Sequence, residues 1–367
     1  MEVLLIAGAR PNFMKIAPIY REALKHPSVV CKLVHTGQHY DYEMSQAFFE
    51  DLEIPEPHFF LNAGSGSHAE QTAKIMVAFE NVCVQEKPDL IMVVGDVNST
   101  LACSIVAKKL LIQVAHVEAG LRSFDLTMPE EINRMVTDAI TDYFFVTEQS
   151  AIENLEREGK PKERIHFVGH VMIDNLLHQL KKLENGAKAD FPTVSLKDGL
   201  GEYVFLTLHR PANVDSRESF LEIADALNEV AAEYPIIFPV HPRTRKMMEV
   251  HGVELSPRIH LLSPLGFKES LYLWKDALMV MTDSGGLQEE TTALGVPCVT
   301  LRENTERPIT IQMGTNILGG VKRDSILRAC RESLSGRGKR GGVPPRWDGR
   351  AAERIWEVIA GGERTET

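Results

Sequence analysis

Residues 282–290 read Thr-Asp-Ser-Gly-Gly-Leu-Gln-Glu-Glu and directly follow an apolar run, Ala-Leu-Met-Val-Met, at 277–281. This order of residues predicts a strand, a tight glycine turn and the start of a helix. Such a turn presents unpaired backbone N–H groups and the positive end of the helix dipole to an anion. A carboxylate one turn into the helix, at Glu289 or Glu290, suits the hydroxyls of a ribose. The stretch therefore predicts a nucleotide site, with the diphosphate at one end and the sugar at the other.

The same alternation of apolar runs and helical segments continues along the whole chain. It is the pattern of βαβ units in a parallel sheet. We expect strands at residues 3–7, 32–35, 90–94, 114–117, 143–146 and 165–168, and again at 203–208, 236–240, 259–262, 278–281 and 298–301. Val, Ile and Leu dominate these runs without strict alternation, as expected for strands that are buried on both faces. The expected fold class is therefore α/β with parallel sheets.

The two series of strands are separated by a connector at residues 184–201. This segment contains Asn185-Gly186, Pro192 and two further glycines, which favour turns over core elements. A chain of 367 residues is also long enough for two domains. We expect an N-terminal domain at residues 1–168 and a second domain at 169–350.

Composition excludes several classes of protein. Hydrophobic residues make up 44% of the chain and charged residues 25%, which is ordinary for a soluble globular protein. No apolar run approaches the length of a membrane span, and the N-terminus lacks the basic and apolar regions of a signal peptide. The five cysteines are scattered without CxxC spacing, which argues against disulfides and zinc and fits the cytoplasm. The net charge of −11 argues against nucleic acid as a partner, although local cations could still hold a small anion.

Polar clusters follow directly on the apolar runs in both halves of the chain. They lie at residues 9–12, 95–99 and 118–122 in the first half, and at 209–213, 241–244 and 283–286 in the second. Ligands of open α/β sheets bind at the carboxyl ends of the strands. Two such edges facing each other would form a ligand cleft between the domains.

Three acids, Asp96, Glu118 and Glu130, lie at or near the strand ends of the first half. Asp96 could instead cap a helix, and Glu130 could simply favour a helix dipole. Glu118 closes a buried run, where an unpaired acid is costly, and a structural ion pair with Arg122 or Arg134 is the alternative. Several acids that converge on one cleft are typical of sites that transfer protons.

Basic residues follow the strands in both halves. Arg10 and Lys15 come after the first strand and could contact a diphosphate, Arg as a bidentate fork and Lys as a point charge; an ordinary strand–helix turn is the alternative. His209 and His241 close neighbouring strands, and each is followed by arginine, such as Arg243. This repetition favours a functional site over two structural histidines.

Arg307 follows the strand expected at 298–301. It could pair with Glu303 or Glu306, or it could contact a phosphate or sugar. We expect no metal, because the chain has neither HExxH nor Cys/His ligand spacing.

Eight of these segments together resemble the non-hydrolysing UDP-N-acetylglucosamine 2-epimerase family, over roughly residues 1–360. They are residues 8–11 (Gly-Ala-Arg-Pro), 95–96 (Gly-Asp), 116–122 (His-Val-Glu-Ala-Gly-Leu-Arg), 129–134 (Pro-Glu-Glu-Ile-Asn-Arg), 208–210 (Leu-His-Arg), 241–242 (His-Pro), 283–290 (Asp-Ser-Gly-Gly-Leu-Gln-Glu-Glu) and 305–308 (Thr-Glu-Arg-Pro). The resemblance implies a GT-B fold, with two Rossmann-like domains, a cleft between them and a final helix at 351–362 that packs back on the first domain. It also implies a homodimer.

The family's functional residues transfer to matching positions of this sequence. The catalytic groups fall on Asp96, Glu118, Glu130 and His209. The UDP ligands fall on Arg10, Lys15, His241, Ser284, Gly285, Gly286, Glu290 and Arg307, and we add Arg122 and Arg243 as further substrate-binding candidates. The resemblance implies no cofactor: neither NAD nor a metal is needed, and the sequence carries neither signature.

The resemblance implies epimerisation at C2 of UDP-N-acetylglucosamine to give UDP-N-acetylmannosamine. UDP would leave C1 as the C2 proton is lost, and would then add back to the glycal. The alternatives are a hydrolysing epimerase, an epimerase of a modified UDP-sugar such as a UDP-diacetamido-uronic acid, a glycosyltransferase, and an inactive UDP-sugar sensor.

This chain departs from many family members at Asn12, Val97 and Pro211. The region around Pro211 and Gln38-His39 resembles the part of bacterial members that binds a second, activating UDP-sugar. The departure at Pro211 therefore argues against such activation here.

Overall fold

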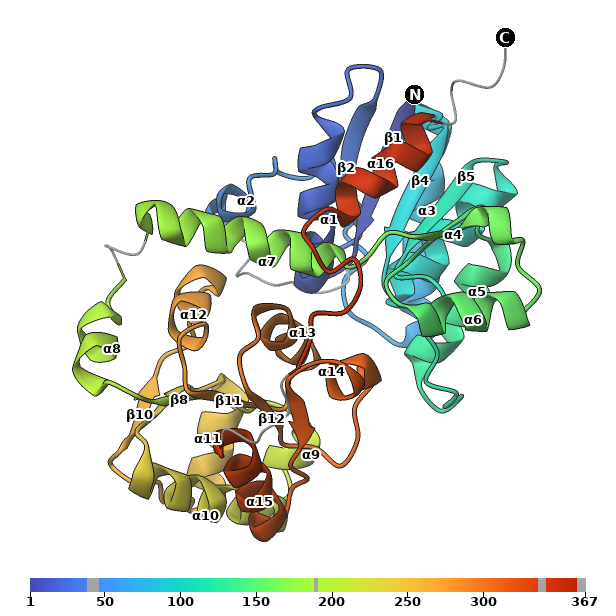
Figure 1. The fold of residues 1–367 in the computed structure, drawn as a ribbon. Coiled ribbons are helices and arrows are strands. Elements are labelled where there is room, and N and C mark those ends of the chain that lie inside the picture. Colours follow the sequence, from blue (N-terminus) through green and yellow to red (C-terminus); the bar gives the residue numbers. More distant parts are fainter. Residues whose placement is uncertain (38–45, 188–190, 336–340, 362–367) are drawn as a thin grey trace. The chain divides into compact units, whose positions relative to one another are not determined.

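The computed structural model describes residues 1–37, 46–187, 191–335 and 341–361, and the chain forms two compact units (Figure 1). Unit 1 comprises Met1–Asn175 and the C-terminal segment that begins at Pro345. Unit 2 comprises Leu176–Pro344. Each unit contains one parallel sheet with helices between the strands.

Unit 1 contains a seven-stranded sheet in the order β3-β2-β1-β4-β5-β6-β7. Its strands are β1 (Glu2–Ala7), β2 (Val30–His35), β3 (Phe59–Phe60), β4 (Leu90–Val94), β5 (Gln113–Val117), β6 (Tyr143–Val146) and β7 (Ile165–Phe167). Its helices are α1 (Arg10–Ala23), α2 (Gln46–Leu52), α3 (His68–Glu86), α4 (Asn98–Lys109), α5 (Pro129–Ile140), α6 (Gln149–Arg157), the start of α7 (Val171–Lys182), and α16 (Ala351–Gly361). The six strands expected in this half are confirmed, and β3 is an addition.

The first strand shows why these runs are apolar throughout. Successive side chains of a strand point to opposite faces of the sheet. Val3 and Leu5 belong to one core cluster, with α1 and α16, whereas Leu4 and Ile6 belong to another, with α3 and α4. Because helices cover both faces, no position on the strand is left for a polar residue.

The C-terminal helix α16 completes the core of unit 1. Trp356 is buried and its Nε1–H donates to the carbonyl oxygen of Ile19 on α1 at 2.8 Å. Asp174 caps the helix, because its carboxylate accepts from the backbone N–H of Ala351 (3.1 Å) and Ala352 (2.7 Å). Burial raises the pKa of Asp174 to about 6. The last described helix is therefore part of the same core as the first strand.

Unit 2 contains a six-stranded parallel sheet in the order β10-β9-β8-β11-β12-β13. Its strands are β8 (Val204–Thr207), β9 (Ile236–Pro239), β10 (Ile259–Leu262), β11 (Met279–Thr282), β12 (Cys298–Thr300) and β13 (Asn316–Leu318). Its helices after α7 are α8 (Val194–Leu200), α9 (Pro211–Val214), α10 (Arg217–Glu233), α11 (Pro242–His251), α12 (Phe267–Trp274), α13 (Gly285–Leu294), α14 (Pro308–Gln312) and α15 (Arg323–Leu334). The five strands expected in this half are confirmed, and β13 is an addition.

Each sheet has one point at which the strand order reverses. In unit 1 this point lies between β1 and β4, and in unit 2 it lies between β8 and β11. Open α/β sheets bind ligands at the carboxyl ends of the strands at such a switch point. The turns there begin at Gly8 and Gly95 in unit 1, and at Leu208 and Asp283 in unit 2. The topology therefore brings four of the sequence clusters to two switch points.

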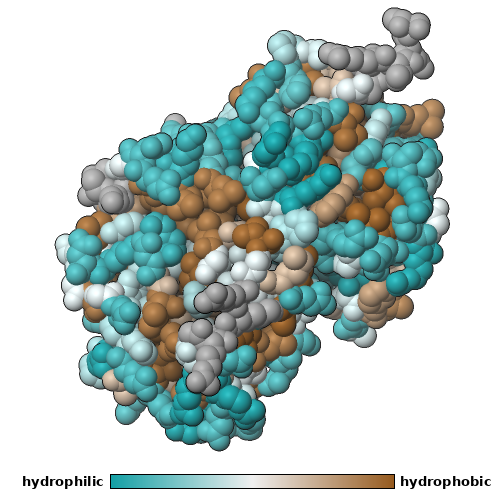
Figure 2. Space-filling model, in the orientation of Figure 1, coloured by the Kyte–Doolittle hydropathy of each residue, from teal (hydrophilic) through white to brown (hydrophobic). Residues whose placement is uncertain are grey.

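The outer surface of the helices is mainly polar on the face shown in Figure 2, with smaller apolar groups between the polar side chains. Across the described ranges, the structure contains no helix with the length and apolar character required to cross a bilayer.

Candidate functional site

The switch point of unit 1 is organised by Asn12, in the first turn of α1. Its Oδ1 accepts from the backbone N–H of Gly8 (3.2 Å) and Ala9 (2.9 Å), and its Nδ2–H donates to the carbonyl oxygen of Val94 (3.3 Å). An amide suits this position because it both accepts and donates, which a carboxylate does not. Asn12 therefore ties the turn after β1 to the end of β4, and Arg10 lies half-buried at the start of α1.

Lys15 and Glu118 form the central ion pair of this switch point. Lys15 Nζ lies 2.6 Å from Glu118 Oε2, and the two side chains are only 15% and 5% exposed. Glu118 directly follows β5 and has a φ of 69°, a left-handed conformation that is unfavourable for glutamate. Its other oxygen, Oε1, is buried and accepts no hydrogen bond from the described residues. A strained, buried carboxylate with an unpaired oxygen is typical of a reactive site.

The glycine at position 95 makes room for this pair. Gly95 has a φ of 67°, and a Cβ built on it would lie 3.1 Å from Lys15 Nζ. A larger residue would therefore be strained and would crowd the ammonium group.

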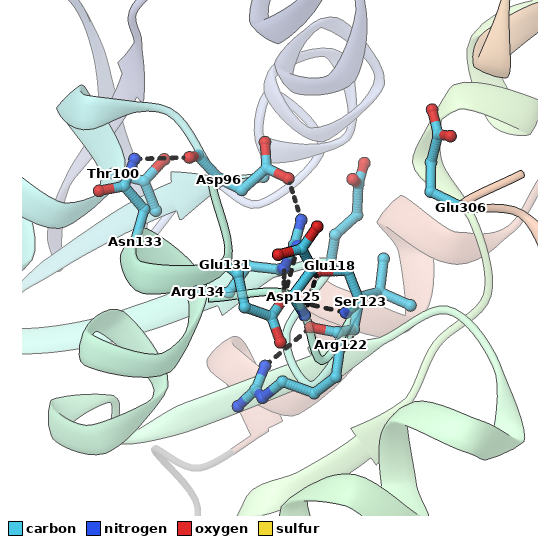
Figure 3. Close-up of polar contacts among 12 residues, drawn as sticks. Asp96, Thr100, Glu118, Arg122, Ser123, Asp125, Glu131, Asn133, Arg134 and Glu306 are labelled. Atoms are coloured by element: carbon cyan, nitrogen blue, oxygen red, sulfur yellow. Dashed lines mark hydrogen bonds and ion pairs between the residues drawn. The ribbon is translucent and has the colours of Figure 1, made fainter. Parts of the chain in front are cut away.

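Asp96 contacts a second cation, Arg134 of α5 (Figure 3). Arg134 Nη1 lies 2.5 Å from Asp96 Oδ2, while its Nε and Nη2 contact Glu131 at 3.0 and 2.5 Å. Burial would raise the pKa of Glu131, but backbone N–H groups of Ser123 and Phe124, together with Arg134, lower it. Glu131 thus holds the guanidinium in place, and the guanidinium holds Asp96.

The alternative reading of Asp96 as a helix cap is not observed. Helix α4 begins at Asn98, its N-cap is Val97, and no side chain caps it. Glu130, by contrast, is exposed at the second residue of α5. Among the described residues, no hydrogen bond or ion pair joins Glu130 to Asp96 or Glu118. The structure therefore brings Asp96 and Glu118 to one switch point, each beside a cation, and leaves Glu130 on the surface of α5.

Arg122 differs from its expected role as a substrate ligand. Its side chain is 2% exposed and contacts Asp138 at 2.7 Å and Glu158 at 2.8 Å. Asp138 also contacts His116 Nδ1 at 2.7 Å, and His116 Nε2 lies 2.9 Å from the carbonyl oxygen of Gly95. Burial would raise the pKa of Asp138, but His116 and Arg122 lower it. Arg122 therefore belongs to a buried network beneath the Gly95 turn.

The switch point of unit 2 is built around Asp283, which is buried at the end of β11. Its carboxylate accepts from the backbone N–H of His209 (2.9 Å) and Arg210 (2.8 Å) and from Asn213 Nδ2 (3.2 Å). His209 Nδ1 lies 2.9 Å from Asp283 Oδ1. Burial would raise the pKa of Asp283, but His209 and the backbone donors lower it. Asp283 thus orients the imidazole so that Nε2, on the opposite side of the ring, faces away from the carboxylate.

Helix α13 begins next to this pair, as the glycine turn predicts. Ser284 is its N-cap residue, and the backbone N–H of Ser284 donates to Thr282 Oγ1 at 2.9 Å. The N–H groups of Gly285, Gly286 and Leu287 belong to the first turn, which has no intrahelical acceptors. A Cβ added at Gly286 would meet no atom within 4 Å, so the space beside Gly286 is open, whereas Glu306 Oε1 lies beside Gly285. The turn therefore has the donors and the room that an anion requires.

Further into α13, Glu290 is buried beside Glu289. Burial, with a smaller contribution from Glu289, raises the pKa of Glu290 to about 8. Glu289 Oε1 lies 2.7 Å from Arg307 Nε, so Arg307 pairs with an acid that the sequence did not suggest as its partner. An uncharged buried acid at this position is unusual and suits a hydroxyl-bearing ligand.

The remaining candidates of unit 2 lie at the start of α11. His241 is the N-cap residue, and its Nδ1 accepts from the backbone N–H of Arg243 at 3.2 Å. The rings of His209 and His241 are 6.0 Å apart. Arg243 pairs with Asp215, with Nε 2.9 Å from Oδ1. His209 and His241 are therefore close neighbours, whereas Arg243 is bound to an acid at the surface.

In the described part of the chain, no group of three or more His, Cys, Asp or Glu side chains could hold a metal ion. Gln38 and His39, which belong to the activator region of the family resemblance, lie outside the described residues.

Sequence reasoning does not identify Asp283, Asp138 or Glu131 as residues of the functional site. Asp283 lies in the motif at residues 282–290, in which Ser284 and Gly285, rather than the acid, indicate an anion site. The signal that could have identified it is its position at the end of an apolar run, where a buried acid needs partners. Asp138 lies one helical turn after Arg134 on the buried face of α5, but that face is formed by polar residues, so no apolar pattern marks Asp138 as buried.

Comparisons with known proteins show the family to which the chain belongs. The family model described as UDP-N-acetylglucosamine 2-epimerase matches residues 21–360. The UDP-N-acetylglucosamine 2-epimerase of Methanocaldococcus jannaschii is 42% identical over 371 residues, covering 99% of this chain and all of that protein. The UDP-2,3-diacetamido-2,3-dideoxy-D-glucuronate 2-epimerase of Pseudomonas aeruginosa is 38% identical over 363 residues, covering 98% of this chain and 99% of that one.

A solved structure extends the comparison to three dimensions. The M. jannaschii UDP-GlcNAc 2-epimerase, crystallised in complex with UDP-GlcNAc and UDP, superposes with a TM-score of 0.85 at 41% identity, covering 99% of this chain and 100% of that chain. The two parallel sheets with alternating helices are the GT-B fold expected from the sequence. In fold, in sequence and in the order of its motifs, this chain belongs to the UDP-N-acetylglucosamine 2-epimerase family.

Proposed function

We propose that this protein epimerises UDP-N-acetylglucosamine reversibly at C2 to UDP-N-acetylmannosamine, and that it needs neither NAD nor a metal. The observation that carries the proposal is the pair of buried or half-buried acids, Asp96 and Glu118, each beside a cation at one switch point. Unit 2 separately carries a nucleotide-type turn at residues 283–290. A glycosyltransferase of the same fold would not need these acids.

The chemistry explains why acids and cations are both required. C2 of the sugar carries an acetamido group and no adjacent carbonyl, so its proton is too weakly acidic for simple abstraction. In the proposed first step the C1–O bond to the phosphate breaks, and its electron pair leaves with UDP. The C2 proton passes to a carboxylate, and its C–H electron pair forms the C1=C2 double bond of 2-acetamidoglucal. UDP then adds back to C1 while a proton is delivered to the opposite face of C2.

We assign the residues accordingly. Asp96, Glu118 and Glu130 move the C2 proton, and His209, directed by Asp283, assists the leaving UDP. The N-terminal turn of α13, from Ser284 to Gly286, binds the diphosphate together with five cationic side chains. Glu290 accepts hydrogen bonds from the hydroxyl groups of the ribose. The cations are Arg10, Lys15, His241, Arg243 and Arg307. Arg122 is left out of this set because its guanidinium is buried against Asp138 and Glu158.

The resemblance also leads us to propose a homodimer in the cytoplasm. Exposed apolar side chains on α5, at Ile132, Met135 and Val136, support a second copy of the chain as a partner, and sedimentation equilibrium would measure it. Five free cysteines, four of them buried, support a reducing compartment.

Proton NMR of the protein with UDP-N-acetylglucosamine in D2O tests the function directly. We expect UDP-N-acetylmannosamine with deuterium at C2 and no free sugar, in the presence of EDTA and without NAD. Free N-acetylmannosamine together with UDP would instead establish the hydrolysing reaction. A protein that binds UDP but leaves this substrate unchanged would contradict the assigned sugar. It would then be tested with UDP-2,3-diacetamido-2,3-dideoxy-D-glucuronate, the sugar in the name of the 38% identical relative.

Glu290→Gln should stabilise the fold and weaken UDP binding. The folded-state pKa of about 8 exceeds the ordinary value of 4.5, so between these pH values the folded protein keeps a proton that the unfolded chain releases. Stability therefore falls as pH rises through this window, by up to about 1.4 kcal/mol per pH unit. Glutamine does not titrate, so its free energy of unfolding lacks this pH dependence. Urea unfolding at pH 5 and pH 8 should therefore show that the variant is more stable relative to the wild type at pH 8 than at pH 5.

The same variant lacks the carboxylate that we assign to the ribose, and calorimetry should show an affinity for UDP lower by about tenfold or more. Glu254→Gln, an exposed acid of the same unit, is the matched control and should change neither property. Unaltered UDP affinity in Glu290→Gln would remove Glu290 from the ribose site.

A further inference from the structure

Glu306, on the loop between β12 and α14, is held by two arginines of unit 2. Its Oε1 lies 3.0 Å from Arg210 Nη2, and its Oε2 lies 2.7 Å from Arg302 Nη2. Burial would raise the pKa of Glu306, but Arg302 and then Arg210 lower it to about 2. The side chain is therefore an anion at any pH at which the enzyme would work.

This anion lies against the first turn of α13. A Cβ built on Gly285 would lie 2.9 Å from Glu306 Oε1, so the carboxylate oxygen occupies the space directly beside that residue. Arg210, its partner, also donates its backbone N–H to Asp283 at 2.8 Å and its Nε–H to the carbonyl oxygen of Asp283 at 3.3 Å. The carboxylate thus lies between a guanidinium of the His209 turn and the positive end of a helix dipole.

A diphosphate bound at the α13 turn would need the same surroundings. Two anions in van der Waals contact repel each other strongly where water is partly excluded, so both cannot keep these positions. Arg302, the other partner of Glu306, lies four residues before it in the same loop.

We propose that Glu306 is an internal competitor of the diphosphate: its carboxylate contacts the first turn of α13 and the guanidinium of Arg210, and UDP displaces it on binding. The inference rests on the proposed UDP site. Displacement lowers the affinity for UDP in every state that carries the diphosphate, and so it favours release. Interactions of this uniform kind change KM and product inhibition more than kcat.

Glu306→Gln tests the competition, because glutamine keeps the shape of the side chain and removes its charge. We expect calorimetry to give a Kd for UDP about five- to tenfold lower than that of the wild type, with KM and the inhibition constant of UDP lower by a similar factor. The affinity for uridine, which carries no phosphate, should not change. The matched control is Glu303→Gln, which removes an exposed acid from the same loop whose carboxylate accepts from the backbone N–H of Val321.

The outcomes separate this inference from the proposed function. An unchanged or weaker affinity of Glu306→Gln for UDP, in a wild type that binds UDP, would overturn the competition and leave the epimerase reaction standing. The same tightening in Glu303→Gln would also overturn it, because the effect would then be one of net charge. A wild type that does not bind UDP would overturn the UDP site itself. Glu306→Asp, which keeps the charge but withdraws it by one methylene from Gly285, should tighten UDP binding less than Glu306→Gln and covers the case in which the latter does not fold.

Discussion

Glu118→Gln should lower kcat for the epimerisation by about 10³-fold or more, while UDP still binds. The carboxylate that we assign to proton transfer at C2 becomes an amide, which neither takes nor delivers a proton, and general acid–base groups contribute about 10²- to 10⁴-fold. The substitution also removes the charge that faces Lys15 at 2.6 Å. The rate of deuterium incorporation at C2, measured by NMR, reports the chemical step, and calorimetry with UDP reports binding.

A surface pair of the same kind provides the control for this prediction. Lys25 and Glu22 are also 2.6 Å apart, but the lysine is 69% exposed. Exposed pairs of this kind contribute about 0–1 kcal/mol, so Glu22→Gln should leave both activity and stability nearly unchanged. Deuterium incorporation by Glu118→Gln at a rate close to that of the wild type would exclude Glu118 from proton transfer and leave its unpaired oxygen without an explanation.

Asp283→Asn should lower kcat by about 10³- to 10⁴-fold, the loss that follows when the acid behind a catalytic histidine becomes an amide. In this chain the acid accepts from His209 Nδ1 at 2.9 Å. An asparagine at this position can turn its N–H₂ group toward the ring, which favours the wrong tautomer and removes the charge that stabilises a protonated imidazole. Some loss of stability will accompany the change, because Asp283 also accepts backbone N–H groups of the same turn.

A double-mutant cycle with His209→Asn shows whether Asp283 acts by positioning the imidazole or only by stabilising the local fold. If Asp283 acts through the imidazole, the double variant should be no slower than the slower single variant, because groups that act as one unit are strongly non-additive. If the kcat losses of the two single variants instead multiply in the double variant, Asp283 acts only by holding the backbone of the turn. Measurement of kcat for all four proteins, with UDP affinity as the test of an intact site, decides between the two.

The fold followed from the sequence because parallel strands that are buried on both faces are apolar without interruption. The two strands that escaped prediction, β3 and β13, are both edge strands, although the other two edge strands, β7 and β10, were predicted. β3 consists of Phe59 and Phe60 alone, too short for any periodicity, and β13 begins with Asn316. An edge strand pairs on one side only and needs no long apolar run, so its sequence carries little signal.

The sequence predicts the part of the site that depends on the order of segments along the chain. The rule that ligands bind at strand ends brought Asp96 and Glu118 to one place, because it depends on the order of segments alone. The partners of these acids depend on contacts across the sheet. Glu118 pairs with Lys15, 103 residues away, rather than with Arg122 or Arg134. Glu118 has a left-handed backbone conformation. Glutamate rarely adopts this conformation, so the sequence alone does not predict it.

The packing of α16 on α1 has a consequence for biosynthesis. A ribosome releases the N-terminal strands first, yet the core around Ile19 stays open until Trp356 has been made, some 337 residues later. Unit 2, whose segments are contiguous from Leu176 to Pro344, can close while unit 1 still exposes the apolar face of its sheet. The nascent chain therefore carries an incomplete first domain for most of its synthesis. During this period its exposed apolar surface is a binding site for chaperones.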